Sequence, residues 1–507
     1  MRDYHDLYNK SDVLQLADVV ENFRDVCIKH YKLDPAWYYT SPGLSWDAML
    51  KMTGVELELL NDYDMILMIK NGIRGGVSTI TTRYGKANNR YMGEAFDENE
   101  PSKFITYLDA NNLYGWAMSK PQPTNGFKWM TETELKHWRD ITSEDGVGCI
   151  LEVDLDYPKT LHDLHNDYPL APESIKVNKV YKLIPNLNDK KNYVVHHENL
   201  QMYESMGLKI TKIHRGIKFN ESPWLKTYID LNTQLRTKAT NEFEKDFFKL
   251  MNNSVFGKTM ENIENHVDIR LVCNEKEAFK LAAKTNYDRF TIFDENLIAV
   301  HMKRTKLVYN KPIYLGMCIL DLSKTLMYDF NYNYIKKKYG SKAKLLFTDT
   351  DSLAYEIQTK DFYKDIANDI QARFDTSEYP RNHPSGIKTG INKKVLGMSK
   401  DEAAGTQIDE FVGLRAKLYS YKMFEGDEQK KCKGIKRNVV KMSLTHDDYK
   451  ACLRNGKTVY KKMNVIRSYK HDIYTEEVNK IALSADDDKR VIMEDGIHTL
   501  ALGHYKL

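Results

Sequence analysis

No apolar run in the sequence is long enough to cross a lipid bilayer, and a stretch such as 65–69 is far too short. The first residues also lack the charged and then apolar pattern of a secretory signal peptide. Internal repeats and low-complexity tracts are missing as well. We therefore expect a soluble protein that uses no membrane and stays inside the cell, in the nucleus or in the cytoplasm.

Cysteine is scarce, and the six residues form no Cys-x-x-Cys pair. That spacing argues against a zinc site and against a disulfide scaffold. His196 and His197 have no Cys or His nearby, and adjacent residues of a strand face opposite sides. We interpret this histidine pair as structural or surface residues.

The sequence also lacks a strong excess of charge of one sign. Its net charge of +4 at pH 7 therefore does not by itself indicate a nucleic-acid partner. Two lysine-rich clusters, 336–344 and 430–437, could follow a phosphate backbone, although a solvated face is the usual explanation for one such run. At 507 residues, of which 42% are hydrophobic, the chain can form two or more domains with sizeable cores.

The most informative positive feature is a pair of carboxylates, Asp349 and Asp351, between an apolar run and an alternating one. Residues 345–348 are typical of a buried strand, and residues 353–357 alternate like a second strand. The carboxylates therefore fall at a tight connection, where they repel each other unless a cation lies between them. Mg²⁺, which prefers oxygen ligands, suits such a pair. An Asp-rich hairpin turn without chemistry is the alternative.

A second carboxylate segment lies earlier in the chain. Residues 104–109 form a short, β-prone run that ends in Asp109. This side chain would project from a strand end, where rigid scaffolds place catalytic groups. The alternative is a helix N-cap, which Asp also suits.

A third segment, 243–258, has the spacing of an amphipathic helix. Lys249, Asn253 and Phe256 lie at i, i+4 and i+7, which places them on one face. A cation, an amide and an aromatic ring suit the phosphate, the polar edge and the base or sugar of a nucleotide. An ordinary half-buried helix with a solvated Lys is the alternative.

Together these segments resemble the motifs of family B DNA polymerases. Residues 109–114 resemble motif A, 249–257 motif B and 347–352 motif C, while 416–419 resemble the later Lys-x-Tyr motif. Within that family, the long interval between motifs A and B is most similar to the protein-primed branch of phages, adenoviruses and self-synthesising transposons. The resemblance implies an α+β, right-hand polymerase fold of palm, fingers and thumb, and the activity of a DNA-directed DNA polymerase.

Several positions depart from the family pattern. Asn112 stands for Ser and Gly115 for Pro in motif A, and Phe256 and Phe347 replace Tyr in motifs B and C. Residues 73–76 resemble the motif between exonuclease and polymerase domains, with Ile where Tyr is usual. None of these changes removes a carboxylate, so they bear on substrate detail rather than on the reaction.

The resemblance implies a role for each site residue. Asp109, Asp349 and Asp351 would bind two Mg²⁺ ions, or Mn²⁺ in their place, and catalyse nucleotidyl transfer to a primer hydroxyl. The incoming dNTP would contact Leu113, Tyr114, Arg236 (or Lys238), Lys249, Asn253 and Phe256. Tyr114 would exclude a ribose hydroxyl by size. Template-primer DNA would contact Gly75, Gly76, Lys417 and Tyr419.

The resemblance also implies the domain boundaries. Residues 1–95 would hold an exonuclease remnant and a linker with a glycine hinge, 96–424 the palm and 425–507 the thumb. The palm would carry fingers at 227–275 and two insertions. The insertion at 119–226 contacts a terminal primer protein in the family, and a second insertion would span 276–340.

The N-terminal segment allows two interpretations. Residues 8–12 resemble the last of three exonuclease motifs, and the other two would lie before Met1, which implies an N-terminally truncated exonuclease domain without activity. Without the family, 11–23 is an amphipathic helix capped by Ser11.

Two other functions stay open at this point. One is a catalytically decayed remnant that only binds DNA, which the truncation favours and the four charged motif residues disfavour. The other is a different Asp-dependent enzyme, such as an RNA-dependent polymerase or a glycosyltransferase. Reverse transcriptases and glycosyltransferases do not have the Lys-x-x-x-Asn-Ser-x-x-Gly helix of 249–257.

Overall fold

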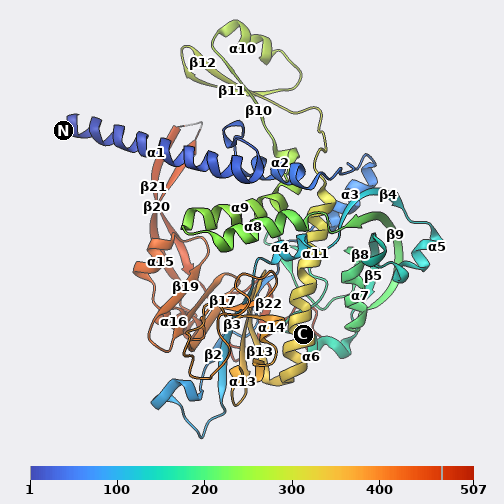
Figure 1. The fold of residues 1–507 in the computed structure, drawn as a ribbon, viewed down its shortest axis with the longest axis vertical. Helices are drawn as coiled ribbons and strands as arrows, with labels where there is room; N and C mark the ends of the chain where they lie inside the picture. Colours follow the sequence, from blue (N-terminus) through green and yellow to red (C-terminus); the bar gives the residue numbers. More distant parts are fainter. Residues whose placement is uncertain (1, 470–471) are drawn as a thin grey trace.

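A ten-stranded sheet runs through the centre of the computed structural model, which describes residues 2–469 and 472–507 (Figure 1). Its main path, in spatial order, is β1 (Ser78–Ile80), β13 (Ala343–Asp349), β14 (Ser352–Gln358), β3 (Lys103–Ala110), β17 (Ile408–Arg415), β18 (Leu418–Met423) and β19 (Glu428–Cys432). Three short strands join this path, namely β2 (Tyr84–Lys86), β15 (Phe374–Asp375) and β16 (Ser399–Asp401). The mixture of this sheet with helices confirms the expected α+β class.

The apolar composition of β13 and β14 explains their central position. Residues 345–348 of β13 are all buried, and so is every residue of β14 from Ser352 to Ile357. A strand that is apolar on both faces has to lie between two layers. The almost entirely buried helix α11 (Ile313–Tyr328) covers one face, where Met327 packs with the side chains of β13 and β14.

Two helices, α8 (Lys226–Lys238) and α9 (Glu242–Thr259), form a pair against which α2 (Ser41–Thr53) packs. Figure 1 shows this pair in green, lying across one end of the central sheet. The helix expected over 243–258 is therefore confirmed as α9. Its N-terminus is capped by Asn241, whose side chain accepts a hydrogen bond from the Glu244 amide at 2.8 Å.

The N-terminal helix is longer and more exposed than the sequence indicates. α1 spans Arg2–Tyr31, so Ser11 lies inside the helix and the expected cap at Ser11 is wrong. Phe23 packs edge-on against Phe243 and Phe247, at centroid distances of 6.0 and 5.1 Å. The apolar positions of this helix before Phe23 are exposed, and they are Leu14, Leu16, Val19 and Val20.

Residues 119–226, expected as an insertion, contain a separate four-stranded sheet. Its spatial order is β4 (Gln122–Trp129), β9 (Lys209–Ser222), β5 (Val147–Asp156) and β8 (Lys190–His196). The helix α7 (His197–Ser205) follows β8 directly and packs against α11. A small hairpin, β6 (Glu173–Val177) and β7 (Val180–Ile184), lies apart from this sheet.

The histidine pair is structural, but its two rings do not face opposite sides. β8 ends at His196 and α7 begins at His197, and the turn from strand to helix brings the two buried rings to 4.4 Å. All six cysteines carry free thiols, as the sequence predicts. Among the described residues, each helix is too short or too polar to span a membrane.

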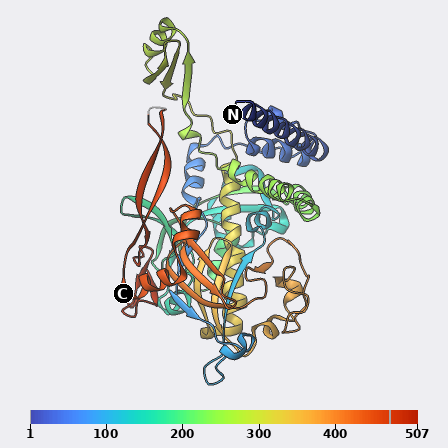
Figure 2. The same ribbon diagram turned by 90° about the vertical axis from the view of Figure 1, so that its left-hand side faces the viewer.

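The interval expected as a second insertion, 276–340, contains two different parts. Most of a small unit that projects from the body lies in it, namely α10 (Glu275–Ala282), β11 (Tyr287–Asp294) and β12 (Leu297–Met302), whereas α11 belongs to the core. The first strand of this unit, β10 (Asp268–Val272), lies before residue 276, in the range expected for the fingers, so the expected boundary at 275 divides the unit. This unit extends from the same end of the molecule as the hairpin of β20 (Val459–Tyr469) and β21 (Asp472–Leu483) (Figure 2).

The range expected for the thumb, 425–507, is also composite. It begins with β19, a strand of the central sheet, and continues through α15 (Arg437–Ser443) and α16 (His446–Asn455) to the β20–β21 hairpin. The last residues return to the body as β22 (Arg490–Ile492) and β23 (Thr499–Ala501). The buried Arg490 guanidinium anchors them by donating to the Asn166 carbonyl at 2.9 Å.

Glu221 on β9 is a buried carboxylate far outside the expected site. It is 4% exposed, and neither carboxylate oxygen accepts a hydrogen bond from any described residue. The nearby Ser143 hydroxyl donates to Glu198 instead, at 2.7 Å. Burial, together with the Glu198 carboxylate, raises the pKa of Glu221 to about 7. Because this pKa lies above that of an unfolded Glu, the folded state binds more protons, and its stability falls as pH rises through this range.

Glu221→Gln should therefore stabilise the chain more at pH 8 than at pH 5, by a difference on the order of 2 kcal/mol in the free energy of unfolding. Urea unfolding at the two pH values measures this difference. Glu144→Gln, which changes an exposed carboxylate, is the matched control and should show no such difference. Equal effects of Glu221→Gln at both pH values would mean that Glu221 ionises in the fold without cost.

Candidate active site

The carboxylates of residues 349–351 lie at a hairpin between β13 and β14, as the sequence predicts. Asp349 is the last residue of β13 and pairs with Ser352, the first of β14. Thr350 at the tip has a φ of 63°, and the Asp351 amide donates to the Asp349 carbonyl at 2.8 Å. A left-handed conformation is rare for a β-branched residue, and such strained turns cluster at functional sites.

The strand β3 brings Asp109 beside this turn, because Asp109 also pairs with Ser352 of β14. The helix cap considered for Asp109 is supplied by Asn112, whose side chain accepts from the Gly115 amide at 3.2 Å. Asp109 thus lies at the end of the strand, and a different residue, Asn112, caps the helix. The three carboxylates line one cavity of about 630 Å³, together with Tyr107, Ser352, Lys417 and Tyr419.

The carboxylates share a partly desolvated, acidic environment. Burial and then the Asp351 carboxylate raise the pKa of Asp109 to about 8. Burial raises the pKa of Asp351 as well, and Asp349 adds to this effect. Such mutual raising means that the protein itself supplies too little positive charge to balance the carboxylates.

Two charged residues beside Asp109, Lys400 and Glu402, belong to none of the sequence motifs. The pairing of β16 with β3 places Lys400 opposite Asp109, and Lys400 forms ion pairs with Glu378 and Glu402, each at 3.2 Å. Glu402 adds negative charge that further raises the pKa of Asp109. Because this pairing joins segments far apart in the chain, only the fold reveals it.

The donor chemistry of the cavity fits a divalent metal ion. Asp349 Oδ1 is buried and accepts no hydrogen bond from the described residues, although it lies 3.3 Å from the Lys417 ammonium. A buried carboxylate oxygen that accepts no hydrogen bond and lies among like charges suits Mg²⁺ or Mn²⁺, which bind oxygen. Within the described part of the chain, no three His, Cys, Asp or Glu side chains already form a group that could hold a metal ion. The carboxylates therefore line the cavity without forming a closed ligand shell.

The glycine linker lies directly behind the hairpin. The Thr350 amide donates to the Val77 carbonyl at 2.8 Å, and a Cβ atom on Gly76 would meet Thr350 Oγ1 at 2.3 Å. Gly75 has open space around it. The linker is therefore packed against the site at Gly76, so close contact with the hairpin, rather than hinge motion, explains the glycine there.

Gly76→Ala should lower the primer extension that the motif resemblance implies on the order of a hundredfold, because its Cβ would displace the turn that positions Asp349 and Asp351. Combining it with Thr350→Gly removes the clashing side chain and should restore part of the rate. Gly43→Ala, whose Cβ makes only an ordinary 3.6 Å contact, is the control. Extension at the wild-type rate by Gly76→Ala alone would contradict the close packing.

Tyr114 lies beside the carboxylates on α4 (Leu113–Met118). Its ring stacks on that of Phe256 from α9, with centroids 4.4 Å apart, and burial followed by Asp351 and Asp349 raises the pKa of Tyr114 to about 12. The fold thus joins motif A and motif B residues in one aromatic pair. Leu113 is different, because its side chain is buried in the hydrophobic core and does not line the cavity.

The α8–α9 pair supplies the expected cations. Arg236 and Lys249 line a small pocket with Asn111 and Asn112, whereas Lys238 lines a separate cavity beside α1. Lys249 lies near enough to the carboxylates to oppose the rise in the pKa of Asp109. Of the two candidates for a second cation, the structure therefore places Arg236 next to Lys249.

Two buried polar atoms in this region have no partner among the described residues. Arg236 Nε donates no hydrogen bond, and burial lowers the pKa of Arg236. Asn253 Oδ1 on α9 accepts none. Buried polar atoms are nearly always paired, so the unpaired Nε of Arg236, whose side chain lines the small pocket, is a candidate contact for a ligand.

One wall of the cavity is basic. Lys417 lies at the β17–β18 turn, and Tyr419 is buried, with its hydroxyl 3.3 Å from that of Tyr107 and its ring stacked on Phe347 at 4.3 Å. The lysine-rich cluster of β19 and α15 continues this wall with Lys430, Lys431, Lys433, Arg437 and Lys441. A row of cations along a groove suits a phosphate backbone.

The other lysine-rich cluster, 336–344, does not reach the cavity. Lys336 is paired with Asp167 at 2.8 Å, and Lys338 with Asp369 at 2.7 Å. These two charges are balanced within the fold, and the other lysines of the cluster, Lys337, Lys342 and Lys344, are exposed. A solvated face explains them without a nucleic acid.

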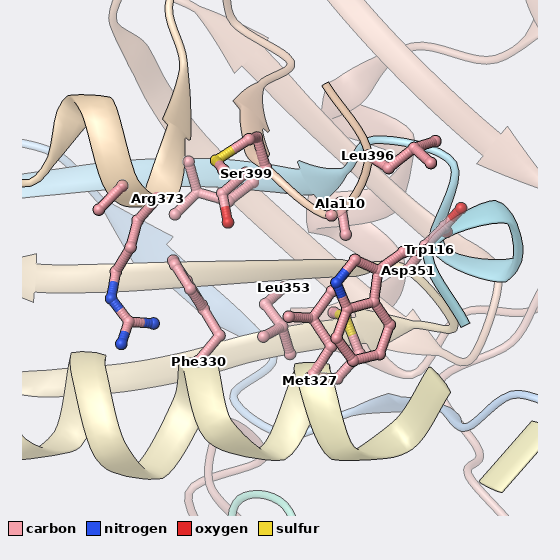
Figure 3. A pocket seen from close by; sticks show the side chains of 14 residues that line it. Ala110, Trp116, Met327, Phe330, Asp351, Leu353, Arg373, Leu396 and Ser399 are labelled. Carbon is pink, nitrogen blue, oxygen red and sulfur yellow. The ribbon is translucent and has the colours of Figure 1, made fainter. Parts of the chain in front are cut away.

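A smaller cavity of about 140 Å³ lies between the sheet and α11, and Figure 3 shows it. Trp116, Met327, Phe330 and Leu353 give it an apolar lining, with Asp351 at one end and Arg373 at the other. The Arg373 guanidinium is already engaged, since it lies over the Tyr334 ring and 3.3 Å from Asp329. This cavity therefore lacks the unpaired polar groups of the larger one.

Comparisons with solved structures find the same fold in the DNA polymerase of phage Phi29. The ternary complex of Phi29 DNA polymerase with primer-template DNA and incoming nucleotide substrates matches with a TM-score of 0.53 and 14% identity, covering 88% of this chain and 68% of that one. An orthorhombic crystal form and the post-translocation binary complex match with TM-scores of 0.53 and 0.52 and the same identity and coverage. Curated protein sequences yielded no match.

A family comparison adds a sequence-level result. The family described as DNA polymerase type B, organellar and viral, matches residues 4–337 of the 507. That range includes Asp109, Tyr114 and Lys249 and ends before the Asp349–Asp351 hairpin, which the fold places beside them. The chain belongs to the organellar and viral family of type B DNA polymerases.

Proposed function

We propose that this chain is an active DNA-directed DNA polymerase that adds deoxynucleotides to a primer hydroxyl. The observation that carries the proposal is the meeting of Asp109, Asp349 and Asp351 at one cavity that basic residues also line. Carboxylates that hold metal ions and cations that hold phosphates are the charged groups that phosphoryl transfer requires.

The three carboxylates would hold two Mg²⁺ ions, or Mn²⁺. Such ions, when bound, lower the pKa of an attacking hydroxyl and balance the charge that develops on the triphosphate. The raised pKa of Asp109 supports this role, because a carboxylate that lacks balancing charge in the protein favours a bound cation.

The incoming nucleotide would lie between α4 and α9. Lys249 and Arg236 would bind the triphosphate, which would give Arg236 Nε the hydrogen-bond partner that it lacks. The Tyr114 ring, backed by Phe256, would lie under the sugar and leave no room for a ribose hydroxyl. Asn253 and Phe256 would pack against the nascent base pair, and Leu113 would contribute through its backbone.

Template-primer DNA would run along the basic wall. Lys417 and Tyr419 would hold the primer terminus, and Gly75 and Gly76 would approach the DNA backbone. The matched Phi29 polymerase structures contain primer-template DNA and nucleotides. By analogy, residues 96–424 act as palm, with fingers at 227–275 and insertions at 119–226 and 276–340, and residues 425–507 act as thumb.

Protein priming is the most specific part of the proposal. Its support is the long interval between motifs A and B, which the structure fills with the separate four-stranded sheet of residues 119–226. That sheet would contact a terminal primer protein, in replication of a viral or transposon-like linear DNA.

Primer extension with purified protein, template-primer DNA, four dNTPs and Mg²⁺ tests the function. We expect templated, Mg²⁺-dependent extension. DNA binding without extension would favour the alternative of a decayed remnant that only binds DNA. The same assay with a mismatched, labelled primer and no nucleotides tests whether the chain lacks exonuclease activity. Shortening that is lost in Asp12→Ala would contradict that expectation.

A further inference from the structure

The loop between β15 and β16, residues 376–398, contains no motif that the sequence analysis identified. It nevertheless reaches the pocket of Arg236 and Lys249, where Lys394 and Leu396 form part of the lining. Lys394 has a φ of 57°, a left-handed conformation that is uncommon for Lys. The position of this side chain therefore depends on contacts that hold the loop.

Those contacts come from the segment that follows Asp109. The Gly397 amide donates to the Asn111 carbonyl at 2.8 Å, and the Asn111 amide donates to the Met398 carbonyl at 2.9 Å. The buried Asp375 carboxylate accepts from the Asn111 side chain at 2.7 Å and from the Lys394 amide at 3.0 Å. Two backbone bonds and a shared carboxylate thus fix the loop to motif A.

Packing fixes the same part of the loop from the other side. Gly397 has a φ of 77°, and a Cβ atom there would meet the Trp116 ring at 2.5 Å. Figure 3 shows Leu396 beyond the end of β3, near Ala110 and Trp116. Lys394 is therefore presented by a rigid part of the loop.

Three cations line this pocket, and carboxylates act on them only from a distance. Among the described residues, none of Arg236, Lys249 and Lys394 has a carboxylate within 4.0 Å of its charged nitrogens. The carboxylates that act on these cations from farther away are Asp246 on Arg236, Glu242 on Lys394, and Asp109 and Asp351 on Lys249. Glu242 also forms an ion pair with Lys245 at 2.6 Å. Burial and the neighbouring Arg236 charge lower the pKa of Lys394. Like charges held together in this way favour a bound anion.

We infer that Lys394 is a third triphosphate-binding residue, which the 376–398 loop contributes opposite Arg236 and Lys249. This inference rests on the proposed function, and it adds a contact from outside the α8–α9 pair. The bound anion would be the triphosphate of the incoming nucleotide. It would lie between the α8–α9 pair and the 376–398 loop, which is hydrogen-bonded to motif A. Nucleotide binding would thereby hold α8 and α9 against the carboxylate site.

Two measurements test this role. The first is titration calorimetry of inorganic tripolyphosphate with the metal-free, DNA-free protein. The second is steady-state primer extension at varied dNTP. Lys394→Ala should weaken tripolyphosphate binding roughly tenfold and raise KM for dNTP by about the same factor, with kcat changed less than about threefold. Lys394→Arg should restore both, and Lys393→Ala, which changes the exposed neighbour, should alter neither.

The possible results separate this inference from the proposed function. Weakened tripolyphosphate binding in Lys249→Ala but not in Lys394→Ala would overturn the inference and leave the polymerase intact. A second result would also overturn the inference. In it, Lys394→Ala lowers kcat and raises KM by equal factors, lowers the melting temperature, and is not rescued by Lys394→Arg. The loop would then have only a structural role. Lys394-dependent binding in a protein that extends no primer would support the anion site and count against the function.

Discussion

Asp349→Asn is expected to lower primer extension by about a thousandfold, which corresponds to ~4 kcal/mol of transition-state stabilisation. The substitution removes one of three carboxylates around the cavity and, with it, a negative charge that the metal ions would balance. The shape of the side chain is kept, so the hairpin between β13 and β14 should remain. Rates of single-nucleotide insertion at saturating Mg²⁺ and dNTP measure the effect.

The thermal stability of Asp349→Asn should not fall with its activity. Asp349 raises the pKa of Asp351, so loss of its charge relieves repulsion in the metal-free fold. The ion pair with Lys417 is also lost, but both side chains are partly exposed, and exposed pairs contribute about 0–1 kcal/mol. We expect an unchanged or raised melting temperature in the absence of metal. Asp25→Asn, on exposed α1, is the control. A variant that extends primers at the wild-type rate would remove Asp349 from the site.

Tyr114→Val is expected to change sugar choice. Its ring stacks on that of Phe256 and lies near enough to Asp351 and Asp349 for their charges to raise its pKa, and the sugar of the proposed nucleotide would lie there. Because a steric block acts on the difference between two substrates, its removal should raise ribonucleotide insertion by about a hundredfold. Deoxynucleotide insertion should stay within about tenfold, or ~1.4 kcal/mol. Insertion efficiencies for matched deoxy- and ribonucleotides, in wild-type and variant protein, measure the ratio.

The competing explanation makes Tyr114 a packing residue of α4. Truncation of a packed aromatic side chain costs stability on the order of 3 kcal/mol and should lower both insertion activities together. Tyr114→Phe separates the two ideas further, because it keeps the ring and removes only the hydroxyl. It should retain wild-type sugar discrimination. A parallel loss of both activities in Tyr114→Val, with a lowered melting temperature, would discard the steric role.

Local patterns in the sequence determined the elements that carry the motifs. The apolar run before Asp349 and the alternation after Asp351 predict two strands with a tight turn, and the structure has that hairpin. The helical spacing of 243–258 predicts α9. These predictions succeed because the periodic patterns of strands and helices depend only on a few neighbouring residues. The N-terminal helix is the exception: its apolar face is equally clear, yet the part before Phe23 is exposed. Periodicity shows which face is apolar, but not whether another element covers it.

Tertiary structure alone decided which side chains meet. The antiparallel pairing of β14 with β3 puts Asp109 beside the hairpin, and the pairing of β16 with β3 adds Lys400 opposite Asp109. The direction in which side chains leave α8 and α9 places Arg236, not Lys238, next to Lys249. The 376–398 loop brings in Lys394 through hydrogen bonds to Asn111 and Asp375. Each of these contacts joins segments far apart in the chain, where no local spacing constrains the distance, so only the packed fold could establish them.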